Sequence, residues 1–141
     1  MPRGFASADA AQAAFYHAFQ DLDVDLMGEV WSDVDGVLCL HPGGDLLQGR
    51  EAVLQSWLEI FGNAEPPSID FRPLQQLERS GIAIHLVEES IKARRGSQGE
   101  GTRVIATNVF VERDGGWYMI EHHASVPLIR PKPRRSGPRL H

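Results

Sequence analysis

The second half of the chain strongly constrains the fold, because it contains four consecutive segments with the composition of β-strands. A turn sequence, Arg113 to Gly116, separates the last two segments and is typical of a β-hairpin. Strands joined by short turns pair in the antiparallel sense, so we expect one antiparallel sheet. Its expected strands cover residues 69–77, 82–91, 103–112 and 117–126.

The first part of the chain has helical periodicity instead. Ser7 is a suitable N-cap for a helix whose apolar residues recur at intervals of three and four from Ala11 to Leu22. Similar spacing predicts a short helix over residues 25–31 and a third helix after Gly49. Helices that precede an antiparallel sheet predict the α+β class, with the helices gathered on one face.

Charge divides the chain into an acidic body and a basic end. The whole sequence of 141 residues has a net charge of -5, but residues 127–141 contain five cations and no acid. We therefore expect one domain over residues 1–126, followed by a Pro/Arg-rich tail over residues 127–141. An acidic body argues against nucleic-acid binding. The sequence contains no continuous stretch of the roughly 18 apolar residues that a membrane span needs. Its single cysteine favours a reducing, cytoplasmic environment.

His41 is the first candidate for chemistry. It ends an expected strand over residues 37–41 that is apolar on both faces, and Pro42-Gly43-Gly44 follows directly. An imidazole at the edge of an apolar region can act as a general acid or base near neutral pH. The alternative is a structural imidazole that bonds to the Gly43-Gly44 loop. No carboxylate occurs between Gly36 and Gly44 that could replace it as the base.

Two further polar sites lie in the expected strands. Asn108 interrupts an apolar strand, and a buried amide needs hydrogen-bonding partners. His122 and His123 are consecutive, so they face opposite sides of the sheet. Simple alternation places His123 on the face of Trp117 and Met119, but the hairpin register leaves open which face is the inner one.

Several short motifs, each different, follow one another along the chain in a recognisable order. They are Phe15-Tyr16 with Phe19, Trp31, Leu40–Gly44, Gly49-Arg50, Ser56-Trp57, Ala106–Val111, Gly115–Trp117 and His122–Ser125. Over residues 8–126 this set resembles the nuclear transport factor 2-like superfamily, in particular its SnoaL-like and ketosteroid-isomerase-like branch. The resemblance implies an antiparallel sheet curved into a cone, with three helices from the N-terminal half closing it over an apolar pocket. It also implies a homodimer formed through the outer face of the sheet.

The resemblance also suggests roles for individual residues. It implies that Tyr16 donates a hydrogen bond to a developing oxyanion and that His123 points inward, with His122 nearer the dimer face. We expect His41 and Tyr16 to be catalytic and Asn108 and His123 to bind a ligand. Trp31 and Trp57 are expected in the core or the pocket wall, where they would also contact the ligand.

Two functions remain open on this basis. One is a small-molecule-binding protein that acts as an isomerase or lyase on a hydrophobic carbonyl compound, without a metal or an organic cofactor. The other is a non-catalytic dimeric domain that binds a protein. The sequence contains no phosphate-binding or serine-hydrolase motif. A metal site from His41, Asp45 and His123 lacks the usual ligand spacing, so we expect none.

Overall fold

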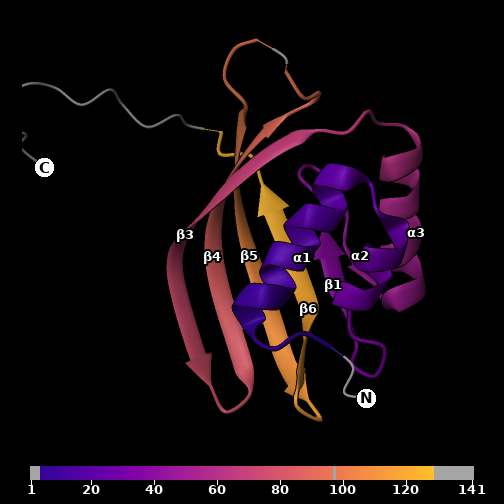
Figure 1. Ribbon diagram of the computed structural model, residues 1–141, viewed down its shortest axis with the longest axis vertical. Coiled ribbons are helices and arrows are strands. Elements are labelled where there is room, and N and C mark those ends of the chain that lie inside the picture. Colours follow the sequence, from indigo (N-terminus) through magenta and orange to yellow (C-terminus); the bar gives the residue numbers. More distant parts are fainter. Residues whose placement is uncertain (1–3, 97, 129–141) are drawn as a thin grey trace, which may run out of the picture.

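Six strands form one curved sheet and three helices cover one of its faces, within the part of the chain that the structure describes (Figure 1). This computed structural model describes residues 4–96 and 98–128. The helices are α1 (Ala8–Asp21), α2 (Val24–Val30) and α3 (Arg50–Gly62), and the strands are β1 (Leu38–Leu40), β2 (Leu47–Gln48), β3 (Ser68–Arg79), β4 (Ile82–Lys92), β5 (Thr102–Arg113) and β6 (Gly116–Ser125). The predicted α+β class is confirmed.

The strands lie in the order β2-β1-β6-β5-β4-β3. Strands β3 to β6 form the predicted antiparallel meander, and each pairs with the next along the chain. The sheet as a whole is mixed, because β1 pairs in parallel with β6 and places Leu40 beside His123. The two-residue strand β2, which the sequence did not indicate, pairs with β1 at the edge.

Helices α1 and α3 begin where the sequence predicts them, and α2 begins one residue earlier than predicted, at Val24. Ser7 caps α1, and its hydroxyl oxygen accepts a hydrogen bond from the amide of Ala10 at 3.0 Å. Asp23 caps α2 in the same way, through the amide of Leu26 at 3.0 Å. Helix α3 begins directly after Gly49. In the described part of the chain, no helix is long and apolar enough to cross a membrane.

Arg50 joins α3 to the end of α2. Its guanidinium donates to the carbonyl oxygen of Trp31 at 2.6 Å and to that of Gly28 at 2.7 Å. Carbonyl groups at a helix end have no partner within the helix, so these bonds satisfy groups that would otherwise need water. One cation thereby holds two helices together.

The core lies between the helices and the inner face of the sheet, and Phe15 is at its centre. The Phe15 ring is fully buried and lies 4.9 Å from Tyr16, 5.4 Å from Trp57 and 4.7 Å from His122, between ring centroids. The contacts with Tyr16 and Trp57 are edge-to-face, a geometry that stabilises aromatic pairs beyond the area that they bury. The core therefore continues directly into a group of polar side chains.

A β-bulge in β6 reverses the side-chain alternation of that strand. Val109 pairs with Glu121 but Phe110 pairs with Met119, so Ile120 is an extra residue without a partner on β5. Met119 and His122 consequently lie on the same, helix-covered face, although their numbers differ by three.

The bulge corrects the prediction for the two histidines. His122 is 2% exposed and contacts the core, whereas His123 is exposed on the opposite face. The inward orientation of His123 was an expectation from the family resemblance. Period-two alternation groups His123 with Trp117 and Met119, but it omits the residue that the bulge inserts and so cannot correct that expectation. His123 is thus not an inward-facing ligand-binding residue.

The proposed boundary at residue 126 follows directly after the end of β6 at Ser125. Leu128 is almost fully exposed. The rest of the predicted basic tail, from residue 129 on, lies outside the described residues.

We predict that replacing the two histidines by alanine has very different effects on stability. His122→Ala removes a buried ring and one hydrogen bond of Asn108, so unfolding in urea should show a loss of about 2–4 kcal/mol. His123→Ala, one residue away, should change the unfolding free energy by less than about 0.5 kcal/mol. Equal losses would contradict the bulge.

Candidate functional site

Tyr16 and Glu89 form a hydrogen-bonded pair between the helices and the sheet. The Tyr16 hydroxyl, on α1, donates to Oε2 of Glu89, on β4, at 2.5 Å. Both side chains are almost completely buried, at 3% and 1% exposure. No cation pairs with the Glu89 carboxyl among the residues that the structure describes, so its charge is compensated by hydrogen bonding alone.

Asn108 connects this pair to the rest of the sheet. Its Nδ2 group donates to the Tyr16 hydroxyl at 3.1 Å and to Oε1 of Gln12 at 3.0 Å. Its Oδ1 atom accepts from Nδ1 of His122 at 2.6 Å, and Gln12 also accepts from Nδ1 of His85 at 3.1 Å. All of these side chains are buried.

The hydrogen bonds of this buried cluster are consistent with a single set of proton positions. Because Asn108 Oδ1 and Gln12 Oε1 can only accept, His122 and His85 must each carry a proton on Nδ1. Tyr16 receives a hydrogen bond from Asn108 and donates its own proton to Glu89. The chain of hydrogen bonds therefore ends at the Glu89 carboxyl. We call this group the buried polar cluster; its members are Gln12, Tyr16, His85, Glu89, Asn108 and His122.

Burial shifts the pKa values of the cluster toward the neutral forms. Removal from water raises the pKa of Glu89 to about 7, although the bond from Tyr16 acts in the opposite direction. The pKa of Tyr16 lies well above its usual value, through burial first and the nearby Glu89 charge second. Burial lowers the pKa of His122 to about 3, with smaller contributions from His41 and His123. Near pH 7, the Glu89 carboxyl can therefore gain or lose a proton.

Phe71 covers the Tyr16 side of the cluster. Its ring, on β3, stacks on the Tyr16 ring with centroids 4.3 Å apart and an angle of 20° between the planes. Phe71 is 36% exposed, while Tyr16 is 3% exposed. The Phe71 ring thus contacts the buried phenol on one side and solvent on the other.

His41 lies in a separate environment. Its Nε2 atom is 2.9 Å from the Ser56 hydroxyl, and Ser56 in turn donates to the carbonyl oxygen of Val53 at 2.6 Å. The Ser56 proton is therefore used, so His41 donates from Nε2 and its Nδ1 atom carries the lone pair. The ring packs edge-on against Trp57 at 4.7 Å, and burial lowers its pKa.

The predicted site residues thus form two groups. Tyr16 and Asn108 come together, but the structure does not bring His41 into hydrogen-bonding contact with them. The backbone of the following loop, rather than the imidazole, makes the expected turn contact, because Gly44 donates to the His41 carbonyl oxygen at 2.8 Å. Trp57 lies between the two groups, with its ring centroid 6.1 Å from that of His122.

Trp31 and Trp57 are core residues, as predicted. They are 1% and 2% exposed. Among the described residues, their indole Nε1 atoms are the only fully buried side-chain nitrogen or oxygen atoms without a hydrogen-bonding partner. An unpaired buried donor is costly. A role in ligand binding remains a prediction for both.

The sequence reasoning missed Glu89, His85 and Gln12. The signal for the first two was present, because period-two alternation places His85, Val87 and Glu89 on one face of the strand. Gln12 lies one turn before Tyr16 on α1, on the same side of the helix. None of them stood out, since acids and glutamines usually lie at the surface.

Other parts of the described chain offer less for chemistry. Among the described residues, no three His, Cys, Asp or Glu side chains lie close enough together to hold a metal ion. Burial raises the pKa of the Cys39 thiol to about 12, which keeps it protonated and unreactive. An apolar hollow of about 130 Å³ lies between α2 and α3, and Val24, Met27, Leu54, Trp57, Leu58 and Phe61 line it.

Comparison with known families identifies one match that covers most of the chain. The sequence profile of the SnoaL-like domain matches residues 8–129. The F-box protein SKIP8 of Arabidopsis thaliana is 31% identical over 115 residues, which are 82% of this chain and 47% of that protein. The chain therefore spans about half the length of this curated relative.

Solved structures agree with this match. A protein of Thiobacillus denitrificans, provisionally assigned as a calcium/calmodulin-dependent protein kinase type II association domain, is 32% identical with a TM-score of 0.83. The match covers 89% of this chain and 99% of that one. An NTF2-like protein of Streptomyces avermitilis, provisionally assigned as a dehydratase, is 29% identical with a TM-score of 0.73, over 84% and 93% of the two chains.

We predict that Glu89→Gln removes a pH-dependent cost of folding. The pKa of Glu89 is about 7 in the folded protein, against 4.5 when unperturbed. Because the folded pKa is the higher one, Glu89 destabilises the protein progressively as pH rises from about 4.5 to about 7. The variant should therefore gain stability relative to the wild type by about 3 kcal/mol across that window. Urea unfolding of both proteins at a series of pH values measures the difference.

Glu88→Gln is the matched control. Glu88 is the neighbouring residue on the outer face, where Arg103 and Arg72 hold its pKa below the usual value. Its replacement should give no gain as pH rises toward 7. A difference between Glu89→Gln and wild type that is constant from pH 5 to pH 7 would show that Glu89 ionises normally.

Proposed function

The chain belongs to the SnoaL-like domain family of the NTF2-like superfamily, and from this premise we propose that it binds a small hydrophobic carbonyl compound and moves a proton on it. The proposed reaction class is that of an isomerase or lyase that needs no cofactor. One observation carries the proposal: the buried carboxyl of Glu89 is hydrogen-bonded to Tyr16, and no cation among the described residues pairs with it. Buried acids of this kind are costly and concentrate at functional sites.

Tyr16 and Glu89 together are suited to stabilise a developing oxyanion. With a pKa of about 7, Glu89 is partly protonated at neutral pH and can donate a hydrogen bond to a ligand oxygen. Tyr16, which now donates its proton to Glu89, would have to turn that proton toward the ligand. Ketosteroid isomerase uses the same combination of a tyrosine and a protonated carboxylic acid for this purpose. Asn108 would support the phenol by its hydrogen bond to the Tyr16 oxygen.

His41 is the proposed base. Its Nδ1 lone pair is free of the Ser56 bond, and its lowered pKa keeps the imidazole neutral near pH 7. The proposed ligand would extend from Tyr16 past Trp57 toward His41, and Trp31 and Trp57 would contribute apolar walls and their unpaired indole donors. Entry would require the Phe71 ring to leave its stacked position on Tyr16.

Deuterium exchange on a model ketone tests the proposed proton transfer. We predict that the protein accelerates exchange of the α-protons of 1-tetralone in D2O, followed by proton NMR. His41→Asn and Tyr16→Phe should each reduce the acceleration by about 100-fold, the usual contribution of a general acid or base. His17→Asn, at an exposed histidine of α1, should leave it unchanged.

Thermal melting of each variant separates chemistry from structure. Loss of exchange at an unchanged melting temperature supports the proposed roles. A large fall in the melting temperature of His41→Asn would indicate instead that His41 has a structural role, through its contacts with Ser56 and Trp57. If the wild-type protein does not accelerate exchange, the proposed reaction class is wrong for this probe, and native mass spectrometry for a retained ligand decides whether any compound is bound.

A second candidate function is a non-catalytic domain that binds a protein. Two relatives above 30% identity favour it by their names, which refer to an F-box protein and to a kinase association domain. The buried polar cluster also satisfies its own hydrogen bonds without a ligand. Absence of exchange together with absence of a retained ligand would favour this candidate.

For both functions we propose a homodimer formed through the outer face of the sheet. That face carries aliphatic side chains that are 37–50% exposed, on two neighbouring strands: Leu77, Ile82 and Ile84. Large exposed apolar surfaces of this kind usually mark interaction sites. Burial of the same face in a second copy would remove them from water.

Sedimentation velocity tests the dimer. We predict a dimer at micromolar concentration and a shift toward monomer in Ile84→Arg, because a buried unpaired cation at the interface is unfavourable. Leu58→Arg, a similarly exposed leucine on α3, should leave the dimer intact. A wild-type monomer at micromolar concentration would overturn the proposed assembly.

A further inference from the structure

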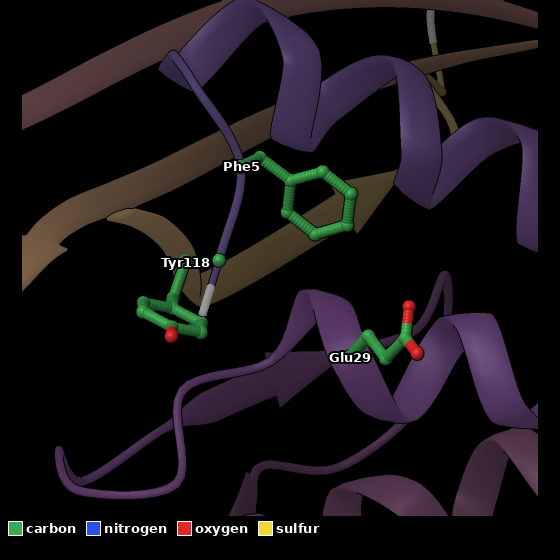
Figure 2. A pocket seen from close by; sticks show the side chains of 4 residues that line it. Phe5, Glu29 and Tyr118 are labelled. Carbon is green, nitrogen blue, oxygen red and sulfur yellow. The ribbon is translucent and has the colours of Figure 1, made fainter. Parts of the chain in front are cut away.

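A hollow of about 300 Å³ lies beside the first residues of β6, before the part of that strand that pairs with β1, and between the N-terminal segment and α2. The described residues that line it are Gly4, Phe5, Glu29 and Tyr118. Figure 2 shows the Phe5 ring and Glu29 to the right of the N-terminal segment and the Tyr118 ring to its left. None of these residues belongs to the buried polar cluster.

Backbone hydrogen bonds to β6 hold the walls of this hollow in place. Phe5 and Trp117 exchange two of them, at 3.1 and 2.8 Å, and the amide of Ser32 donates to the carbonyl oxygen of Met119 at 3.0 Å. The N-terminal segment and the end of α2 are thus anchored on either side of Tyr118. The hollow is therefore a built feature of the fold rather than a gap between loose segments.

Gly4 brings the backbone directly onto the Tyr118 ring. A Cβ atom at this position would lie 2.8 Å from Cζ of Tyr118, closer than any ordinary contact, and the φ angle of Gly4 is +88°. Only glycine readily adopts this conformation and this distance together. The close contact fixes the position of the Tyr118 ring, which is one of the residues that line the hollow.

The chemistry of the lining selects a cation. Two aromatic rings attract positive charge to their faces, and the exposed Glu29 carboxylate has no hydrogen bond or ion pair with another described residue. No Lys, Arg or His side chain is among the described residues that line the hollow. An anion would be repelled, and a single carboxylate is too few ligands for a metal ion.

We propose that this hollow, called the edge site below, binds an alkylated ammonium group through the Glu29 carboxylate and the rings of Phe5 and Tyr118. Methyl groups on nitrogen spread the charge over a larger, weakly hydrated surface, which suits aromatic walls better than a strongly hydrated ion does. The group could belong to a free small amine or to a methylated lysine side chain of another protein. Both sources share the same chemistry at the edge site.

Choline is the probe for the free amine. Titration of ¹⁵N-labelled protein, followed by NMR, should give saturable shifts of the amides around Phe5, Glu29 and Tyr118. The neutral isostere 3,3-dimethylbutan-1-ol has the same shape without the charge, and should bind about tenfold more weakly or not at all. Equal binding of the two compounds would overturn the proposal, because the edge site would then recognise shape and not charge.

Variants assign the binding to the named side chains. Glu29→Gln should weaken choline binding about tenfold, and Tyr118→Leu should also weaken it. Glu59→Gln, an exposed glutamate on α3, is the matched control and should bind as the wild type does. The NMR spectrum of each variant outside the edge site shows whether it is folded. Unchanged affinity in folded Glu29→Gln would contradict the proposal.

A trimethyllysine peptide distinguishes the two sources. A short peptide that contains one trimethyllysine, compared with the same peptide carrying an acetylated lysine, should bind more tightly than choline if the natural ligand is a protein side chain. Choline binding as tight as that of the peptide favours a free amine. Absence of saturable shifts with both choline and the peptide would rule out an ammonium site at this position.

Discussion

Asn108 lies where α1 crosses β5 and β6, and its amide makes hydrogen bonds to three side chains at once. Oδ1 accepts from His122, while Nδ2 donates to Gln12 and Tyr16. Turning the amide over would place donor against donor and acceptor against acceptor, so only one orientation satisfies the site. The position of α1 on the sheet, the tautomer of His122 and the direction of the Tyr16 proton all depend on this side chain.

The aromatic core separates this cluster from the second candidate group. Phe15 and Trp57 lie between the buried polar cluster and His41. His41 instead contacts the hydroxyl of Ser56. A hydrogen bond needs direct contact between donor and acceptor, so the packed rings keep His41 from joining the hydrogen bonds of the buried polar cluster. A ligand large enough to contact both Tyr16 and His41 would therefore have to replace aromatic packing, which makes Phe71 and Trp57 as important to the proposed function as the polar groups.

Periodicity in the sequence was sufficient for the class of fold and for most of its elements. The apolar spacing after Ser7 predicts α1, and alternation with a glycine turn predicts β5 and β6, since these local patterns depend only on the chain's own geometry. Asn108 was also identified, because a polar residue within an apolar pattern is visible locally, whereas Tyr16 was identified through the family resemblance. Their direct contact across 92 positions was not predictable from either segment alone.

The sequence by itself determined which residues alternate or repeat, whereas the tertiary structure decided which of them face each other. The extra residue at Ile120 moved His122 inward and His123 outward, because a bulge changes the parity of a strand without altering its composition. Glu89 became the central acid of the site only because β4 places it under α1, where burial removes water from its carboxyl. Pairing between distant strands and desolvation are properties of the packed chain, and no local pattern encodes them.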